Sequence, residues 1–153
     1  MATDYSDRIE KRVMLRAPRS RVWKAIADAA QFGEWFGARL QGDFVEGATI
    51  RGNITYPGYE HLIMEMKVDR IEPETLFSYW WHPNAIDPNF DYSTEPMTLV
   101  EFRLEDSDGG TVLTIVESGF DRIPIDRRAD AFLSNDGGWT EQTENIERYV
   151  SGQ

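Results

Sequence analysis

The C-terminal quarter of the chain carries the pattern that most constrains the fold. Five residues there are separated by 7, 4, 3 and 4 positions, which places them on one stripe of an α-helix: Phe132, Trp139, Thr143, Ile146 and Val150. The phase of this stripe continues across Gly137-Gly138, and we therefore predict one long helix from about residue 126 to residue 150. The alternative is a break at the two glycines, with Asp136 capping a second helix.

The middle of the chain shows the two-residue period of β-strands. We predict strands in five segments: residues 48–56, 60–71, 76–82, 98–105 and 111–118. The turn at residues 106–110 favours a tight hairpin, because its glycines adopt the positive φ that such turns need. Links this short join antiparallel strands, since parallel strands need a long crossover. Residues 83–96 hold three prolines, three acidic residues and no basic one, and are predicted to form a loop.

The N-terminal part is predicted to add one strand and two short helices. Residues 8–17 alternate as a strand does, and Pro18 follows where it can open a helix, because the first helical turn needs no N–H. The apolar face of this helix consists of Val22, Trp23 and Ile26. A second helix is predicted over residues 29–36 and ends at Gly37. This order predicts an α+β helix-grip fold, in which a curved antiparallel sheet wraps around the C-terminal helix and leaves a cavity between them.

Length and composition exclude several classes of function. The chain has 153 residues, which favours one domain with a core over about residues 8–150. It lacks cysteine, so disulfides, cysteine zinc sites and a cysteine nucleophile are excluded. With 27 acidic and 16 basic residues and a net charge of −11, it should bind neither nucleic acid nor an anionic membrane surface. The polar, acidic start is unlike a signal peptide and no apolar run is long enough to span a bilayer, so we expect a cytoplasmic protein.

The two histidines, His61 and His82, lie in no metal-binding spacing such as H-E-x-x-H. Neither glycine pair belongs to a phosphate-binding loop, and we predict no metal and no cofactor. If Trp80 faces the C-terminal helix, His82 does too, by the two-residue period. It would then lie at the mouth of the cavity, where it could bind a ligand or transfer a proton. The alternative is a half-exposed residue at the end of its strand, bonded to the adjacent loop; His61 is expected at a strand end on the surface.

Glu117 is the second titratable candidate. One face of the last strand holds Thr111, Leu113, Ile115 and Glu117, and the other holds Val112, Thr114, Val116 and Ser118. Both faces are partly apolar, so the pattern does not decide which of them is inside. A carboxyl group in an apolar cavity could serve as an acid or a base. The alternative is an inert carboxylate paired with Arg51 or Arg103.

Several short motifs occur in an order that resembles a known superfamily. They are Val22-Trp23, Trp35-Phe36-Gly37, the strand 76–80, Gly110-Thr111, Glu117-Ser118-Gly119-Phe120, Gly137-Gly138-Trp139 and Asn145-Ile146. Over about residues 8–150 the chain resembles the START-like (SRPBCC) superfamily, and more narrowly the bacterial proteins similar to the C-terminal domain of the activator of heat-shock protein 90 ATPase. The resemblance implies a helix-grip fold with a central cavity and favours the Glu117 face as the inner one. It implies no single reaction, since relatives include lipid and hormone binders, polyketide cyclases and a cochaperone domain.

We predict that the cavity binds a small apolar or aromatic molecule. Trp23 is expected in the core. The predicted ligand-binding residues are Trp35, Tyr56, Met64, Trp80, His82, Phe102, Glu117, Phe120 and Trp139. One alternative is a chaperone-binding role, which an apolar outer face of the sheet would favour. The other is a cyclase or dehydratase that uses His82 and Glu117, which requires both to reach one substrate. We expect that they do not converge, and we assign no catalytic residue.

Overall fold

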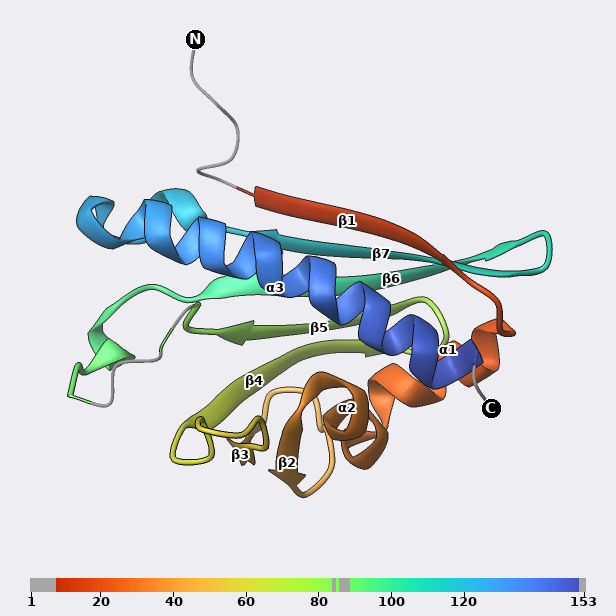
Figure 1. Cartoon of the computed structure of the whole chain (residues 1–153), viewed down its shortest axis with the longest axis horizontal. Helices are drawn as coiled ribbons and strands as arrows, with labels where there is room; N and C mark the ends of the chain where they lie inside the picture. Colours follow the sequence, from red (N-terminus) through yellow and green to blue (C-terminus); the bar gives the residue numbers. More distant parts are fainter. Residues whose placement is uncertain (1–7, 84, 86–88, 152–153) are drawn as a thin grey trace, which may run out of the picture.

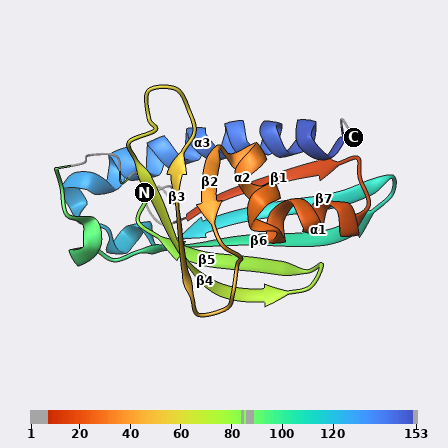
Figure 2. The same cartoon turned by 90° about the horizontal axis from the view of Figure 1, so that it is seen from below.

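A computed structural model describes residues 8–83, 85 and 89–151. Within these residues, seven strands form one antiparallel sheet in the order β1-β7-β6-β5-β4-β3-β2. The helix α3 (Ile125–Ser151) runs across one face of the curved sheet. The helices α1 (Arg19–Ala27) and α2 (Ala29–Phe36) lie near the C-terminal end of α3 (Figures 1 and 2). This arrangement confirms the predicted α+β helix-grip fold.

Most strands lie within the predicted segments or differ from them by a few residues at the ends. They are β1 (Arg8–Leu15), β3 (Thr49–Ile54), β4 (Ile63–Glu72), β5 (Leu76–Trp81), β6 (Thr98–Ser107) and β7 (Gly110–Ser118). The short strand β2 (Ala38–Gln41) is not predicted by the sequence pattern. Two single-turn helices complete the described chain: η2 (Tyr92–Thr94) before β6 and η3 (Phe120–Arg122) after β7.

The helix α3 is continuous from Ile125 to Ser151, as predicted, and the alternative of a break at Gly137-Gly138 is wrong. Phe132 and Trp139, on either side of the glycines, are both buried, so one stripe of the helix packs on the sheet along its whole length. A methyl group at either glycine would meet nothing outside the local helix within 4 Å. The two glycines therefore leave open space beside the helix.

A glycine turn brings α2 against β2. Gly37 adopts φ 98°, and its N–H donates to the carbonyl of Gly33, so the helix ends there and the chain reverses at once. A Cβ at Gly33 would lie 2.1 Å from the carbonyl oxygen of Ala38, so only glycine allows this close approach. Phe36, the last residue of α2, is thereby held next to α3, where Gln142 Nε2 donates to its carbonyl at 2.9 Å.

The structure shows which side chains of β7 and β5 face α3. The sequence pattern left this undecided for β7 and predicted it wrongly for β5. On β7, Leu113, Ile115 and Glu117 are buried beneath α3, which confirms the Glu117 face as the inner one. On β5 the prediction is wrong, because Tyr79 and Trp81 face α3 and Trp80 faces outward. Both faces of β5 are apolar and largely buried, so the two-residue period alone cannot fix its orientation.

The outer face of the sheet carries many charged side chains. Glu10 and Glu101 flank Val116 across the strands, and Arg12 and Arg103 flank Thr114 in the same way. An extensive apolar outer face, the feature that would favour a chaperone-binding role, is therefore not found on the described strands.

The free edges of the sheet are β1 and β2. Beside β1 runs α3, to which Lys11 is linked by an ion pair of 2.9 Å with Asp136. In the described part of the chain, no helix is long and apolar enough to cross a membrane.

Candidate ligand-binding pocket

Glu117 lies between the sheet and α3, and it is fully buried, with 0% of its surface exposed. Four side chains donate hydrogen bonds to its carboxylate. Thr98 Oγ1 and Trp81 Nε1 lie 2.6 and 2.8 Å from Oε2, and Trp139 Nε1 lies 2.8 Å from Oε1. Asn135 Nδ2 lies 2.9 and 3.0 Å from the two oxygens. The donors come from β5, β6 and α3, so one carboxylate joins the helix to three neighbouring strands.

No cation accompanies this buried carboxylate among the described residues. The predicted alternative of an ion pair with Arg51 or Arg103 is wrong. Arg51 lies 2.7 Å from Glu65 and Arg103 lies 2.8 Å from Glu101. Both arginines are on the outer face of the sheet, whereas Glu117 is on the inner one. The charge of Glu117 is thus solvated by four uncharged donors alone.

Tyr79 lies on the same inner face, and it is fully buried. Its hydroxyl has no hydrogen-bond partner among the described residues. Burial raises the pKa of Tyr79 well above its usual value, and the charge of Glu117 raises it further. The phenol therefore stays neutral inside the fold at any physiological pH.

A pocket of about 680 Å³ opens beside this buried cluster, between the middle of α3, the ends of β4 and β5 and the loop that follows β5. Three neighbouring aromatic rings, those of Phe36, Trp81 and Trp139, are among its lining, and we refer to them as the floor. Their centroids are 5.8 Å apart for the two tryptophans and 6.0 Å for each tryptophan with Phe36. Around the mouth lie Tyr56, Ile63 and Phe90, each of which is exposed. Polar side chains complete the lining, among them His61, His82, Asp91, Asn135 and Gln142.

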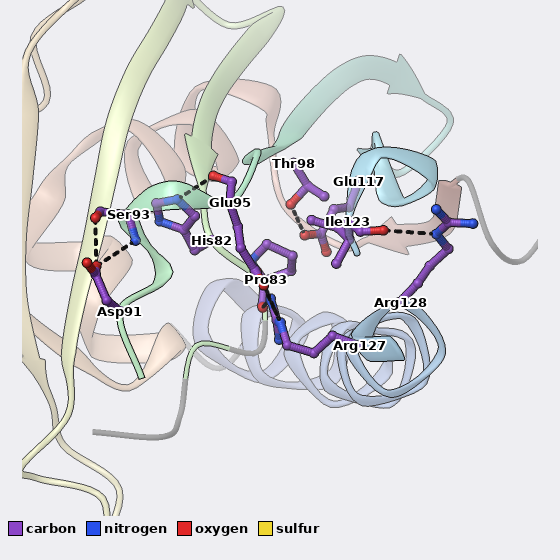
Figure 3. Close-up of polar contacts among 10 residues, drawn as sticks. All are labelled: His82, Pro83, Asp91, Ser93, Glu95, Thr98, Glu117, Ile123, Arg127 and Arg128. Atoms are coloured by element: carbon purple, nitrogen blue, oxygen red, sulfur yellow. Dashed lines mark hydrogen bonds and ion pairs between the residues drawn. The ribbon is translucent and has the colours of Figure 1, made fainter. Parts of the chain in front are cut away.

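His82 lines the pocket from the residue that follows β5. Its Nε2 lies 3.1 Å from the carbonyl oxygen of Glu95 and donates to it, so the half-buried ring is bonded to the adjacent loop (Figure 3). His82 therefore combines features of both predicted environments: it lies in the lining of the pocket, and it is bonded to the adjacent loop. Figure 3 also shows that His82 and Glu117 have separate partners among the residues drawn, and no hydrogen bond or ion pair of the described residues joins the two side chains.

An ion pair anchors the described part of this loop to the first turn of α3 (Figure 3). Arg127 donates to Glu95 Oε1 from Nε at 3.1 Å and from Nη2 at 2.8 Å, and Nη2 also donates to the carbonyl of Pro83 at 3.0 Å. The guanidinium lies 4.9 Å from the ring centroid of Tyr92. One side chain therefore holds both Pro83 and Glu95, the residues at the two ends of the loop.

At the tip of the loop, Asp91 accepts hydrogen bonds from the Oγ and the N–H of Ser93. The side-chain bond, followed by the backbone bond, lowers the pKa of the exposed Asp91 carboxyl. Asp91 therefore stays ionised at the mouth of the pocket down to mildly acidic pH.

The structure brings only part of the predicted binding set together. Tyr56, Met64, His82 and Trp139 line the pocket, and Glu117 lies behind its floor. Whether any of them contacts a ligand stays a prediction.

The other predicted residues lie away from the pocket. Trp35 is buried in the core with its Nε1 bonded to the carbonyl of Ala25 at 2.8 Å, and Phe102 and Phe120 are fully buried. Trp80 is on the outer face, where the guanidinium carbon of Arg122 lies 5.9 Å from its ring centroid. Trp23, expected in the core, is partly buried against it.

The predicted binding set omits several lining residues, including Phe36, Trp81, Asn135 and Gln142. A signal existed for Asn135, because it lies one helical turn before Trp139 and therefore on the same face of α3. For Trp81 the signal was masked by the apolar character of the whole strand β5.

Comparison with known proteins agrees with this fold. A structure of MLL2253 from Mesorhizobium loti is 21% identical, with a TM-score of 0.75, covering 95% of this chain and 98% of that one. The Aha1 dimer from Colwellia psychrerythraea is 17% identical, with a TM-score of 0.71, covering 94% and 95%. DynU16, from the dynemicin biosynthetic locus, is 23% identical with a TM-score of 0.72, and the match covers 95% of this chain but 47% of that one. At these identities the similarity shows the fold alone.

No protein with a curated description matched. The family described as activator of Hsp90 ATPase homolog 1-like protein matches residues 16–151, which is most of the sequence. That match agrees with the resemblance seen in the sequence motifs and with the helix-grip fold of the START-like superfamily. The chain is therefore a member of the activator of Hsp90 ATPase homolog 1-like family.

Proposed function

We propose that this protein binds a small, largely aromatic molecule in the pocket beside α3. The observation that carries the proposal is the floor of the pocket, where the rings of Phe36, Trp81 and Trp139 lie 5.8 to 6.0 Å apart. A volume of about 680 Å³ is in the range of small-molecule sites, roughly 300–1,000 Å³. Aromatic rings with a few polar groups around them are the usual lining of such sites.

The floor is held in place before any ligand arrives. The indole N–H groups of Trp81 and Trp139 both donate to Glu117, and each bond is 2.8 Å long. Two rings that are fixed in this way lose little rotational freedom on binding, so more of the contact energy contributes to affinity. Glu117 has the role of a positioning residue in this proposal.

The two glycines of α3 provide a matched test. Gly138 lines the pocket, whereas the adjacent Gly137 is exposed and is not among the lining residues. Leucine is a good helix former at both positions, and a Cβ at either meets nothing outside the local helix within 4 Å. We expect Gly138→Leu to fill part of the pocket and Gly137→Leu to leave it open.

The assay uses flat two-ring aromatic probes, such as 1-methylnaphthalene and 1-methylquinolinium, and follows the indole N–H signals of the five tryptophans by NMR. Binding should shift the signals of Trp81 and Trp139 and leave that of Trp80 in place. Gly138→Leu should weaken binding at least about tenfold, which corresponds to a loss of about 1.4 kcal/mol of binding free energy. Gly137→Leu should leave the affinity unchanged. The proposal fails if no probe shifts the floor tryptophans, or if both leucine variants bind as the parent does.

The family description points to a second function, stimulation of a heat-shock protein 90 ATPase. The outer sheet face offers little apolar surface for such a partner, since charged pairs such as Glu101–Arg103 cover it. We expect little change in the ATPase rate of a bacterial heat-shock protein 90 homologue on addition of this protein. A rise of several-fold would favour the chaperone role over ligand binding.

An enzymatic role of the cyclase or dehydratase kind has less support. It would need His82 and Glu117 to act on one substrate, and each is engaged elsewhere. His82 donates to the Glu95 carbonyl, and Glu117 accepts hydrogen bonds from four side chains. Neither group is presented for proton transfer in this arrangement.

A further inference from the structure

We propose that the pocket selects an aromatic molecule that carries a positive charge, of the class of N-alkylated or protonated heteroaromatic amines. This inference rests on the proposed function and adds the charge of the ligand to it. Three features of the site favour a cation: the charges of its lining, the buried carboxylate behind its floor and the indole rings that are bonded to that carboxylate.

The first feature is the charge of the lining. Glu65, Asp91 and Glu141 are the acidic residues among the described side chains that line the pocket, and no lysine or arginine is among them. Glu65 is neutralised by an ion pair of 2.7 Å with the exposed Arg51, so Asp91 and Glu141 are the lining carboxylates without an ion-pair partner among the described residues. Within the described part of the chain, Asp91 accepts hydrogen bonds from its neighbour Ser93 and interacts electrostatically with His82, but it forms no ion pair with an arginine or lysine. An anionic ligand would meet repulsion at this mouth, whereas a cation would be attracted.

The second feature is the unpaired charge of Glu117. Its carboxylate is fully buried, and no arginine, lysine or histidine of the described chain forms an ion pair with it. A charge in a medium of low polarisability acts over a longer distance than one in water. Trp81 and Trp139 donate hydrogen bonds to this carboxylate, and their rings also belong to the pocket floor. A cation on the floor would therefore supply the counter-charge that the protein itself lacks.

The third feature is the pair of indole rings between Glu117 and the pocket. A cation is attracted to the face of an indole ring more strongly than to phenylalanine or tyrosine. An N–H group that donates to a carboxylate is polarised, which increases the electron density of the ring it belongs to. The hydrogen bonds of 2.8 Å from Trp81 and Trp139 to Glu117 should thus strengthen the attraction of both ring faces for a cation.

The same kind of contact already occurs within the protein at the edge of this pocket. The guanidinium of Arg127 lies 4.9 Å from the centroid of Tyr92, whose side chain is one of the lining residues. The preferred ligand would repeat this contact on the floor, with its aromatic part against Phe36 and its charge over the indoles.

The test uses three probes of nearly identical shape: 1-methylquinolinium, 1-methylnaphthalene and 1-naphthoate. They differ in charge, which is positive, zero and negative. At low ionic strength, we expect the cation to bind about tenfold more tightly than the neutral probe, and the anion to bind most weakly. Affinities are measured by NMR titration of the indole N–H signals of Trp81 and Trp139.

Charge-neutral variants locate the source of the preference. The combination Glu65→Gln, Asp91→Asn and Glu141→Gln should reduce the ratio of cation to neutral affinity at least about threefold. Glu105→Gln is the matched control, because Glu105 is exposed on β6 and does not line the pocket. That control should leave the ratio as it is in the parent.

The outcomes separate this inference from the proposed function. If the neutral or the anionic probe binds at the floor as tightly as the cation, the charge preference is refuted and the pocket remains a binding site for aromatic molecules. A ratio that the triple variant does not change also refutes it. If none of the three probes shifts Trp81 or Trp139, the proposed function and this inference fail together.

Discussion

Nε1 of Trp139 lies 2.8 Å from Oε1 of Glu117, and this bond joins the long helix to the strand beneath it at the base of the pocket. The same carboxylate accepts hydrogen bonds from Trp81, Thr98 and Asn135. The stability of the fold and the shape of the pocket therefore depend on one buried acidic residue.

Replacement of Glu117 by alanine should lower the free energy of unfolding by about 3 kcal/mol or more, since each buried donor left without an acceptor costs roughly 1–3 kcal/mol. Thr98→Val removes one donor only and should cost about 1 kcal/mol. Urea denaturation measures both, with the exposed Glu105→Ala as a control expected to change stability by less than about 0.5 kcal/mol. A Glu117→Ala protein as stable as the parent would contradict the role assigned to this carboxylate.

Alanine at Gly137 or Gly138 should stabilise the protein by up to about 1 kcal/mol each, because alanine is the better helix former. A Cβ at either site meets nothing outside the local helix within 4 Å. Gly110→Ala is the contrasting variant, since its Cβ would lie 2.0 Å from the carbonyl oxygen of Leu15. Thermal unfolding should show a higher Tm for the two helix variants and a lower one for Gly110→Ala. Equal effects in all three would be evidence against the packing described.

Arg127→Ala should cost about 2 kcal/mol, because it leaves the largely buried carboxylate of Glu95 without its cation. The side chains of this pair are 18% and 8% exposed. Arg127→Lys keeps the charge but loses the forked geometry, and it should lie between the parent and Arg127→Ala. Hydrogen exchange should become faster in residues 90–96 of the loop in both variants. Unchanged exchange there would mean that other contacts hold the loop.

Tyr79→Phe should leave the free energy of unfolding unchanged at neutral pH or raise it by about 1 kcal/mol, since the hydroxyl it removes is buried without a partner. At alkaline pH the two proteins should differ more. The pKa of Tyr79 is raised in the folded state above its value of 10.0, so this residue's contribution to stability is present below pH 10 and is lost as the pH rises above it.

The phenylalanine variant should therefore lose less stability than the parent between pH 9 and 11, a range that spans the ordinary tyrosine pKa of 10.0. Part of the loss should remain, because burial and the bond to Glu34 raise the pKa of Tyr149 to about 12 as well. Denaturation curves at the two pH values measure the difference. Parallel losses in parent and variant would show that Tyr79 ionises without opening the fold.

Ser93→Ala should raise the pKa of Asp91 toward its ordinary value of 3.8, because it removes the side-chain hydrogen bond that contributes most to the lowering. The backbone bond from residue 93 is retained, so the return should be incomplete. A lowered pKa in the folded state means that the contribution of Asp91 to stability is lost as the pH falls through that value. Carbon NMR of the Asp91 carboxyl during acid titrations of the parent and the variant measures the shift, and equal titration curves would contradict the prediction.

Elements with a single strong period could be predicted from the sequence. The stripe from Phe132 to Val150 predicted α3 through its glycines, and the alternation over residues 98–105 predicted β6. Each of these patterns has one apolar face and one polar face, so period and orientation are fixed together. On β5 the residues from Leu76 to Tyr79 are all buried, and the pattern gives the strand but not its orientation.

The site was less accessible to sequence reasoning, because its contacts join residues far apart in the chain. Glu117 could be singled out as a carboxylate on an apolar strand. Its donors Trp81 and Asn135 lie 36 and 18 positions away, and only the packing of α3 on the sheet brings them to it. The strand β2 escaped prediction for a different reason, since four residues are too few to show a period.

The open edges of the sheet bear on how the protein behaves at high concentration. An unpaired strand edge can recruit a strand from another molecule, which leads to polymers and insoluble deposits. Here β2 offers four residues, and β1 carries four charged residues among its eight: Arg8, Glu10, Lys11 and Arg12. A second chain that paired with β1 would have to place its own side chains against these charges and compete with the Lys11–Asp136 contact to the helix. Addition of a strand from another molecule is therefore disfavoured at both edges of the sheet, β1 and β2. We expect the protein to resist aggregation at concentrations at which a sheet with an unprotected edge would aggregate.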